Sequence, residues 1–148
     1  MASRIQWRAE DDDSQVQTTM RRGAVAADVK SRVGFGLRTR HERARLRRKF
    51  HNQLDWSNRT KTPFISTYGR ERAALEEAGR RKRDGKKNVR VVKIDTYQAD
   101  CRVEYRNVRK LAKALGYWIP DKAWRNSEFE YIFLRHIPAS AIMEIIWV

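Results

Sequence analysis

The 148-residue sequence has a single cysteine and no long hydrophobic run, and each absence excludes a class of protein. With Cys101 alone, the chain can form neither an intramolecular disulfide nor a cysteine-rich zinc site, so we expect an inert thiol and no metal. No apolar run is long enough to span a membrane, and residues 1–8 lack the apolar core of a signal peptide. Internal repeats and low-complexity linkers are also absent. We therefore expect one intracellular domain, cytoplasmic or nuclear, that covers residues 1–148.

Acidic residues are outnumbered by basic ones, 18 Asp+Glu against 33 Lys+Arg, and the net charge is +15. Such a field attracts nucleic acid, anionic membrane surfaces, acidic proteins or phosphorylated ligands without choosing among them. Many of the basic residues lie in two runs, Arg38–Lys49 and Arg80–Lys87. Each run is either a solvated face or a contact for nucleic acid. Since no base-reading helix or zinc finger is visible, binding to nucleic acid would be non-specific.

The distribution of apolar residues predicts an α+β fold in which most strands lie late in the chain. The predicted strands are Ile5–Arg8, Phe64–Tyr68, Asn88–Asp95, Ser127–Leu134 and Ala141–Val148. The predicted helices are Arg38–Phe50, Gly69–Arg83 and Val103–Leu115, and the last two are followed by the stop residues Gly85 and Gly116. Between these elements we expect an acidic turn at Glu10–Asp13, short structure in residues 23–37 and an aromatic loop at Tyr117–Asn126.

Two glutamates one residue apart, Glu128 and Glu130, are the most informative feature of the chain. Both fall in a predicted strand, where side chains alternate between faces, so we expect the two carboxylates on one face and Phe129 and Tyr131 on the other. Like charges at this spacing repel, and each raises the pKa of its neighbour. The pair is therefore either a solvated sheet edge or a working site.

Four short motifs follow one another along the chain in an order that is typical of a known enzyme group. They are Trp7-Arg8-Ala9-Glu10, Phe64-Ile65-Ser66-Thr67, Glu128-x-Glu130, and an Ile137-Pro138 turn into the last strand. This order resembles the catalytic core of the cholera-toxin-like mono-ADP-ribosyltransferases, which carry an arginine, a Ser-Thr strand and a Glu-x-Glu strand. Tyr68 stands where those enzymes usually have a second serine, and residues 11–62 hardly resemble them.

The chain is also similar to an uncharacterised domain family that is frequent in filamentous fungi. That family has a Leu-Asp-Trp segment before a Pro-Phe-Ile-Ser strand, found here as Leu54-Asp55-Trp56 and Pro63-Phe64-Ile65-Ser66.

The resemblance to the transferases implies a split β-sheet core with flanking helices, NAD as a substrate, and a set of site residues. Glu130 would hold the ribose hydroxyls of NAD and stabilise the positive charge that develops on the ribose. Glu128 would align the acceptor, which is a guanidinium in arginine-specific members. Ser66 would orient Glu130, and Thr67 would support the strand geometry around NAD. Arg8 would bind a phosphate or ribose oxygen of NAD.

The loop before the glutamate pair and an upstream histidine complete the implied site. This loop often selects the acceptor in the family, and here it carries Trp118, Trp124 and Arg125. We expect the tryptophans chiefly to anchor the loop in the core. The place of His51, upstream of Ser66, fits a contact with the adenosine ribose, but an ordinary surface histidine explains it better.

Two hypotheses from different functional classes follow. The first is a mono-ADP-ribosyltransferase that transfers ADP-ribose from NAD to a protein acceptor, with arginine as one candidate, or an NAD glycohydrolase. The second is a catalytically inactive basic module of the same fold that binds nucleic acid or a partner protein. The first hypothesis requires Arg8, Ser66 and Glu130 to converge on one cleft, with Glu128 at its mouth.

Overall fold

A computed structural model describes residues 3–55 and 59–148. Trp56 of the Leu-Asp-Trp segment therefore lies outside the described residues. The strands are β1 (Ile5–Glu10), β2 (Ala24–Val25), β3 (Phe64–Tyr68), β4 (Arg90–Asp95), β5 (Tyr105–Asn107), β6 (Glu130–Leu134), β7 (His136–Ile137) and β8 (Ile142–Trp147). The helices are α1 (Arg40–Leu54), α2 (Glu71–Arg83), α3 (Val108–Leu115) and α4 (Asp121–Ser127). None of the helices in the described part of the chain is both long and apolar enough to cross a membrane.

The main sheet is antiparallel and is nearly divided in two. Its strand order is β5-β6-β3-β1-β4-β8, and a second sheet contains only β2 and β7 among the described residues. At the centre, β1 and β3 are joined by one pair of residues, Trp7 opposite Tyr68, whereas β1 pairs with β4 from Ile5 to Glu10. The two halves diverge away from this junction, so the split sheet and the α+β class expected from the sequence are confirmed.

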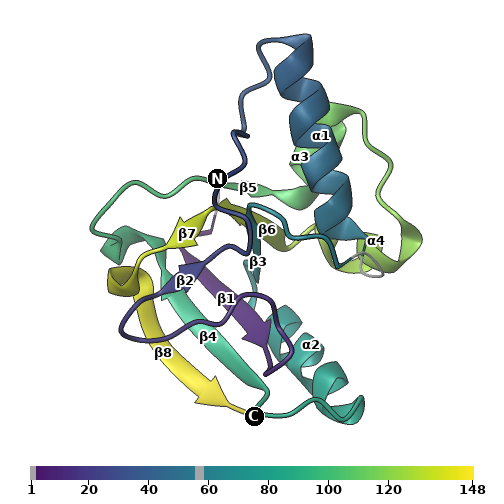
Figure 1. The fold of residues 1–148 in the computed structure, drawn as a ribbon. Helices are drawn as coiled ribbons and strands as arrows, with labels where there is room; N and C mark the ends of the chain where they lie inside the picture. Colours follow the sequence, from purple (N-terminus) through teal and green to yellow (C-terminus); the bar gives the residue numbers. More distant parts are fainter. Residues whose placement is uncertain (1–2, 56–58) are drawn as a thin grey trace.

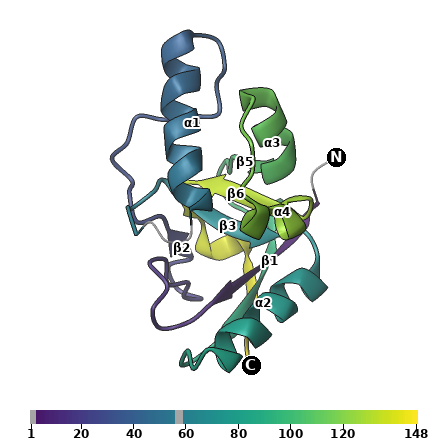
Figure 2. The ribbon, with the colours of Figure 1, turned by 90° about the vertical axis from the view of Figure 1, so that its right-hand side faces the viewer.

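Helices cover the two halves of the sheet separately (Figures 1 and 2). Over the β3–β6 half, Leu46 and Phe50 of α1 and Leu111 of α3 pack against Phe64 and Ile132 in one buried cluster. Each of these side chains is at most 6% exposed, so their burial contributes roughly 1.5–3 kcal/mol apiece before the cost of ordering the chain.

The shorter helix α2 covers the other half of the sheet. Its Ala74 and Ala78 are fully buried against Ala9 of β1 and Val91 of β4. Small side chains at a spacing of four residues let this helix lie close to the strands. As a result, α1 and α2 stand on either side of the junction between β1 and β3 (Figure 2).

The predicted strand at Ser127–Leu134 begins later than expected, at Glu130, and this changes the placement of the glutamate pair. Glu128 has helical dihedral angles, φ −62° and ψ −35°, and it ends α4. The expectation that Glu128 and Glu130 share one face of a strand is therefore wrong, because a helix occupies the preceding residues.

Two further expectations between residues 103 and 126 are also wrong. The start of the helix expected at Val103–Leu115 is strand β5, which pairs with β6, and the Asn107 side chain then accepts a hydrogen bond from the amide of Lys110 to begin α3. The expected aromatic loop contains α4. Trp118 is 86% and Trp124 51% exposed, so neither anchors the loop in the core.

Candidate active site

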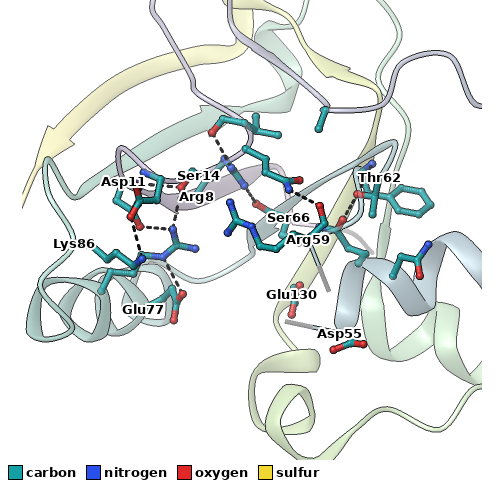
Figure 3. A pocket seen from close by; sticks show the side chains of 18 of the residues that line it. Arg8, Asp11, Ser14, Asp55, Arg59, Thr62, Ser66, Glu77, Lys86 and Glu130 are labelled. Carbon is teal, nitrogen blue, oxygen red and sulfur yellow. Dashed lines mark hydrogen bonds and ion pairs between the residues drawn. The ribbon is translucent and has the colours of Figure 1, made fainter. Parts of the chain in front are cut away.

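A cavity of about 440 Å³ lies where the two halves of the sheet diverge, between α1 and α2. We call it the Glu130 cavity; Figure 3 shows it from close by. Ser66, Tyr68 and Glu130 line it from β3 and β6. Because side chains alternate along a strand, these three continue the face on which Phe64 and Ile132 pack under α1. The same alternation that builds the core thus places polar groups in the cavity beyond the end of the core.

Glu130 is a buried carboxyl of the cavity with a strongly raised pKa. Glu130 is only 5% exposed, and burial raises the pKa of its carboxyl to about 7. A hydrogen bond from the Ser66 side chain works against this rise, while the negative charge of Glu77 adds to it. Near neutral pH, Glu130 therefore exists as a mixture of the acid and the carboxylate.

A relay of side chains fixes the Ser66 hydroxyl. Gln53 of α1 donates from Nε2 to Ser66 Oγ at 2.7 Å, and the hydroxyl of Thr62 donates to Oε1 of the same amide. Because Ser66 Oγ accepts from Gln53, its own proton is available for the Glu130 carboxylate. Gln53 was not among the predicted site residues, although Leu46, Phe50 and Leu54 at four-residue spacing extend α1 beyond the predicted end at Phe50.

Arg8 lies in the wall of the Glu130 cavity and is held by three internal hydrogen bonds. Its Nε donates to Glu10 at 2.9 Å, Nη1 to the carbonyl of Ser66 at 2.9 Å and Nη2 to the carbonyl of Val16 at 3.2 Å. A guanidinium has five N–H donors, so two remain for a ligand. Burial lowers the pKa of Arg8, and the adjacent Glu10 carboxylate opposes this effect.

The Glu10 carboxylate that holds Arg8 is itself fully buried and satisfied. It accepts from Arg90 at 3.1 Å and from both the amide and the hydroxyl of Thr18. Burial alone would raise its pKa, but Arg8 and Thr18 outweigh burial and lower it. Glu10 therefore remains ionised and fixes the position of Arg8. The predicted acidic turn accordingly begins at Asp11, one residue later.

The three residues that the transferase hypothesis requires, Arg8, Ser66 and Glu130, thus line one cavity. A family model described as "Domain of unknown function (DUF7587)" matches residues 1–148. The chain belongs to this family. No curated protein matches the chain.

This DUF7587 chain is similar in structure to a solved chain named EcPltA. The superposition has a TM-score of 0.60 at 12% sequence identity, and it covers 98% of this chain and 75% of EcPltA. EcPltA has the fold of a toxin ADP-ribosyltransferase, so the DUF7587 chain has an ADP-ribosyltransferase-like fold.

Helix α2 of the DUF7587 chain supplies charged side chains that the sequence analysis did not assign to the site. Arg81 Nη1 donates to Asp11 at 2.8 Å and to Ser14 at 3.0 Å, while its Nε donates to Glu77 at 3.0 Å. All four residues line the Glu130 cavity. The sequence showed Arg80–Lys87 only as a basic run. It did not predict this network, because Asp11 and Ser14, two partners of Arg81, lie far away in the chain, after β1.

Tyr68 lines the same cavity in the position where the resembled enzymes usually have a serine. Burial raises the pKa of its phenol, and the negative charge of Glu130 raises it further. The phenol is therefore protonated at every physiological pH and can donate a hydrogen bond into the cavity.

Three residues that the sequence suggested for the site do not line the Glu130 cavity. Thr67 is fully buried on the opposite face of β3, where its hydroxyl donates to Gln6 at 2.7 Å. Glu128 is exposed and lies 3.9 Å from Arg109. His51 shares a 2.7 Å hydrogen bond with Tyr117, as a surface histidine can.

Proposed function

We propose that this protein cleaves the bond between nicotinamide and ribose in NAD at the Glu130 cavity, and passes the ADP-ribose to a protein acceptor or to water. The observation that carries the proposal is the convergence of Glu130, Ser66 and Arg8 on one cavity. The ADP-ribosyltransferase-like fold supports it, because the three residues occupy the strands on which the resembled motifs lie.

The proposed reaction needs an ionised carboxylate beside the ribose. As the C1′–N bond breaks, nicotinamide leaves with the electron pair, and positive charge spreads over C1′ and the ring oxygen. Glu130 stabilises this charge and accepts a hydrogen bond from a ribose hydroxyl, while Ser66 holds its carboxylate in place. The acceptor then attacks C1′ with a lone pair and releases a proton. Activity should therefore rise as Glu130 ionises near pH 7.

Guanidinium groups in the cavity wall suit the diphosphate of NAD. Arg8 offers its remaining donors from β1, and Arg59 lines the cavity from the segment before β3 (Figure 3). A planar guanidinium can form two parallel hydrogen bonds to phosphate oxygens. The two arginines line the same cavity as Glu130, so one bound NAD can reach all three side chains.

When water is the acceptor, the cavity needs no residue that aligns a protein side chain. The resemblance gives Glu128 the task of aligning an arginine acceptor, but Glu128 is exposed and beside Arg109 rather than in the cavity wall. We therefore propose NAD hydrolysis as the activity seen without an added protein, and transfer to a protein once a partner has bound.

The test is nicotinamide release from NAD by purified wild type and by Glu130→Gln. The substitution preserves the shape and removes the charge, so we expect a loss of about 100-fold or more. Glu144→Gln, an exposed substitution on β8, is the matched control and should retain full activity. If the wild type releases no nicotinamide and does not bind NAD in a calorimeter, the enzymatic proposal is wrong and the inactive module stands.

A further inference from the structure

A second cavity, of about 320 Å³, is lined by residues of β5, β6 and α3 and of the segment before α1, and it shares no lining residue with the Glu130 cavity. We call it the Phe35 cavity. The side chains that matter here are aromatic or basic, namely Phe35, Tyr105, Tyr131, Arg106 and Lys110. Its volume falls at the lower end of the range of about 300–1,000 Å³ that is usual for small-ligand sites. Tyr105 belongs to the sheet face on which it stacks against Phe133 at 4.6 Å, so Phe35 is the ring that lies with the basic groups. This pairing of a ring with cations suits a planar ring next to a negative charge.

The chain segments around the Phe35 cavity are rich in basic residues. Residues 30–51 contain nine Lys or Arg and one carboxylate, Glu42, and residues 105–118 contain four Lys or Arg and no carboxylate. Helices α1 and α3, which these segments include, lie side by side in both views (Figures 1 and 2). Arg43 of α1 donates to the carbonyl of Ala114 at 2.9 Å, and Ala114 lines the cavity. We call this surface of α1 and α3 the α1–α3 face.

The two basic runs of the sequence differ in whether carboxylates neutralise them. In the run on α2, Arg80 pairs with Glu77 and Asp84, Arg81 with Asp11 and Glu77, and Lys86 with Asp13. In the run at residues 38–49, as far as the structure describes the chain, one side chain forms an ion pair, Lys49 with Asp28 at 3.7 Å. Among the described residues, carboxylates therefore pair with three of the six basic side chains of Arg80–Lys87, but with one of the seven basic side chains of Arg38–Lys49.

We propose that the α1–α3 face binds single-stranded nucleic acid, with a base in the Phe35 cavity and phosphates on the surrounding guanidinium and ammonium groups. Sites for single strands combine a basic surface with aromatic rings on which unpaired bases stack. The Phe35 ring stacks on Phe64 with centroids 5.9 Å apart, and the Arg106 guanidinium lies 4.7 Å from the Phe35 centroid, so a base would stack on this ring and guanidinium pair. A duplex would meet the charge but could not place a paired base in a cavity.

An anionic membrane fits this face less well than a nucleic acid does. A helix that binds in a membrane interface must bury an apolar side in the lipid. The apolar side of α1, formed by Leu46, Phe50 and Leu54, is already buried within the protein. The exposed side of α1 can therefore contribute charge but not insertion.

This inference is independent of the proposed reaction, because the two cavities share no lining residue. Glu130→Gln should leave nucleic-acid binding unchanged even if NAD is the substrate. The failure of either proposal would thus leave the other untouched.

The experiment is fluorescence anisotropy with a labelled single-stranded oligonucleotide of mixed sequence, titrated at several salt concentrations. Arg43, Arg106 and Lys110 are exposed, so the triple change of all three to Gln should preserve the fold. Each lost phosphate contact changes the slope of log K against log salt by about 0.7, so the slope should fall in magnitude by about 2. The matched control replaces the exposed Lys82, Arg83 and Lys87 of the other run by Gln, and it should bind within about twofold of the wild type.

Phe35→Leu tests the stacking separately, because it keeps an apolar side chain and the net charge. We expect binding to the single strand to weaken about fivefold or more without a change in the salt slope, with a thermal melt to confirm that the variant is folded. Absence of binding by the wild type would overturn the proposal. It would also be overturned by equal losses in the two triple variants, or by tighter binding to duplex or to anionic phospholipid vesicles than to the single strand.

Discussion

At the scale of single residues, the state of Glu130 depends on a balance between burial and one hydroxyl group. Burial raises its pKa to about 7, and the Ser66 hydroxyl lowers it. Gln53 matters because its amide donates a hydrogen bond to Ser66 Oγ. The hydroxyl proton of Ser66 therefore points away from Gln53 and is available for Glu130. Sequence motifs identified the two partners of this contact but not the glutamine that orients them.

We predict that Ser66→Ala raises the pKa of Glu130 further, because the carboxylate loses a donor. Gln53→Ala should act in the same direction but less strongly, since water can reach the freed hydroxyl. The measurement is the ¹³C shift of the Glu130 carboxyl against pH by NMR, which requires no activity, together with the pH profile of nicotinamide release. Gln98→Ala, an exposed control, should leave both curves in place. Unchanged curves in Ser66→Ala would refute the relay.

At the scale of elements, the small β2–β7 sheet depends on one close turn. Gly23 precedes β2 with φ of +74°, and its amide and carbonyl both bond to Thr19. A Cβ at this position would lie 2.1 Å from the carbonyl oxygen of Ile137 in β7. Only glycine meets both the dihedral angle and the space.

Gly23→Ala should therefore lower the free energy of unfolding by at least about 1–2 kcal/mol, the cost of the left-handed conformation alone. The clash with β7 adds to this cost. Gly34→Ala is the matched control, because a Cβ there meets nothing within 4 Å and its φ is not positive. We expect the control to be neutral or slightly stabilising in urea unfolding. Equal stability of the two variants would show that the turn contributes nothing.

The elements that the sequence predicted well are those whose own side chains determine them. β3 has its predicted bounds, and α2 ends at Arg83 before Gly85, which has φ of +82°. Apart from shifted element ends such as that of α1, the errors fall between residues 103 and 130, where short elements depend on distant partners. β5 exists because it pairs with β6, and no local pattern shows that pairing. Glu128 was misplaced for the same reason, since β6 begins only at Glu130, where it pairs with Tyr68 of β3, and Glu128 caps α4.

At the scale of the whole molecule, the split sheet determines which parts of the site a sequence can reveal. Arg8, Ser66 and Glu130 lie on strands in a recognisable order, so their convergence could be predicted. Glu77 and Arg81 could not, because α2 reaches the cavity only when its small residues pack on β1 and β4. The Phe35 cavity on the α1–α3 face shares no lining residue with the Glu130 cavity, so the two proposals concern different parts of the surface.

Buried carboxyls should make the free energy of unfolding depend on pH in two opposite directions, because the pKa of Glu130 is raised and those of Glu10 and Asp11 are lowered. Glu130 has a folded pKa of about 7, above the ordinary value of 4.5. Its folded form therefore holds a proton that the unfolded chain has lost, and its contribution to stability, full below about pH 4.5, is lost as the pH rises through 7. The pKa values of Glu10 and Asp11 are lowered instead, so their contribution is lost as the pH falls below about 4.5. The free energy of unfolding should peak near pH 5.

Glu130→Gln removes the carboxyl with the raised pKa. The free energy of unfolding of this variant should therefore fall less than that of the wild type as the pH rises above 5. Relative to the wild type, the variant should gain up to about 3 kcal/mol between pH 5 and pH 8, because each pKa unit corresponds to about 1.4 kcal/mol. Urea unfolding at a series of pH values measures this difference, with Glu144→Gln as the exposed control that should follow the wild type throughout. A constant difference between Glu130→Gln and wild type across this range would mean that Glu130 titrates with an ordinary pKa. In that case Glu130 would be fully ionised at neutral pH, and nicotinamide release would not rise as the pH passes through 7.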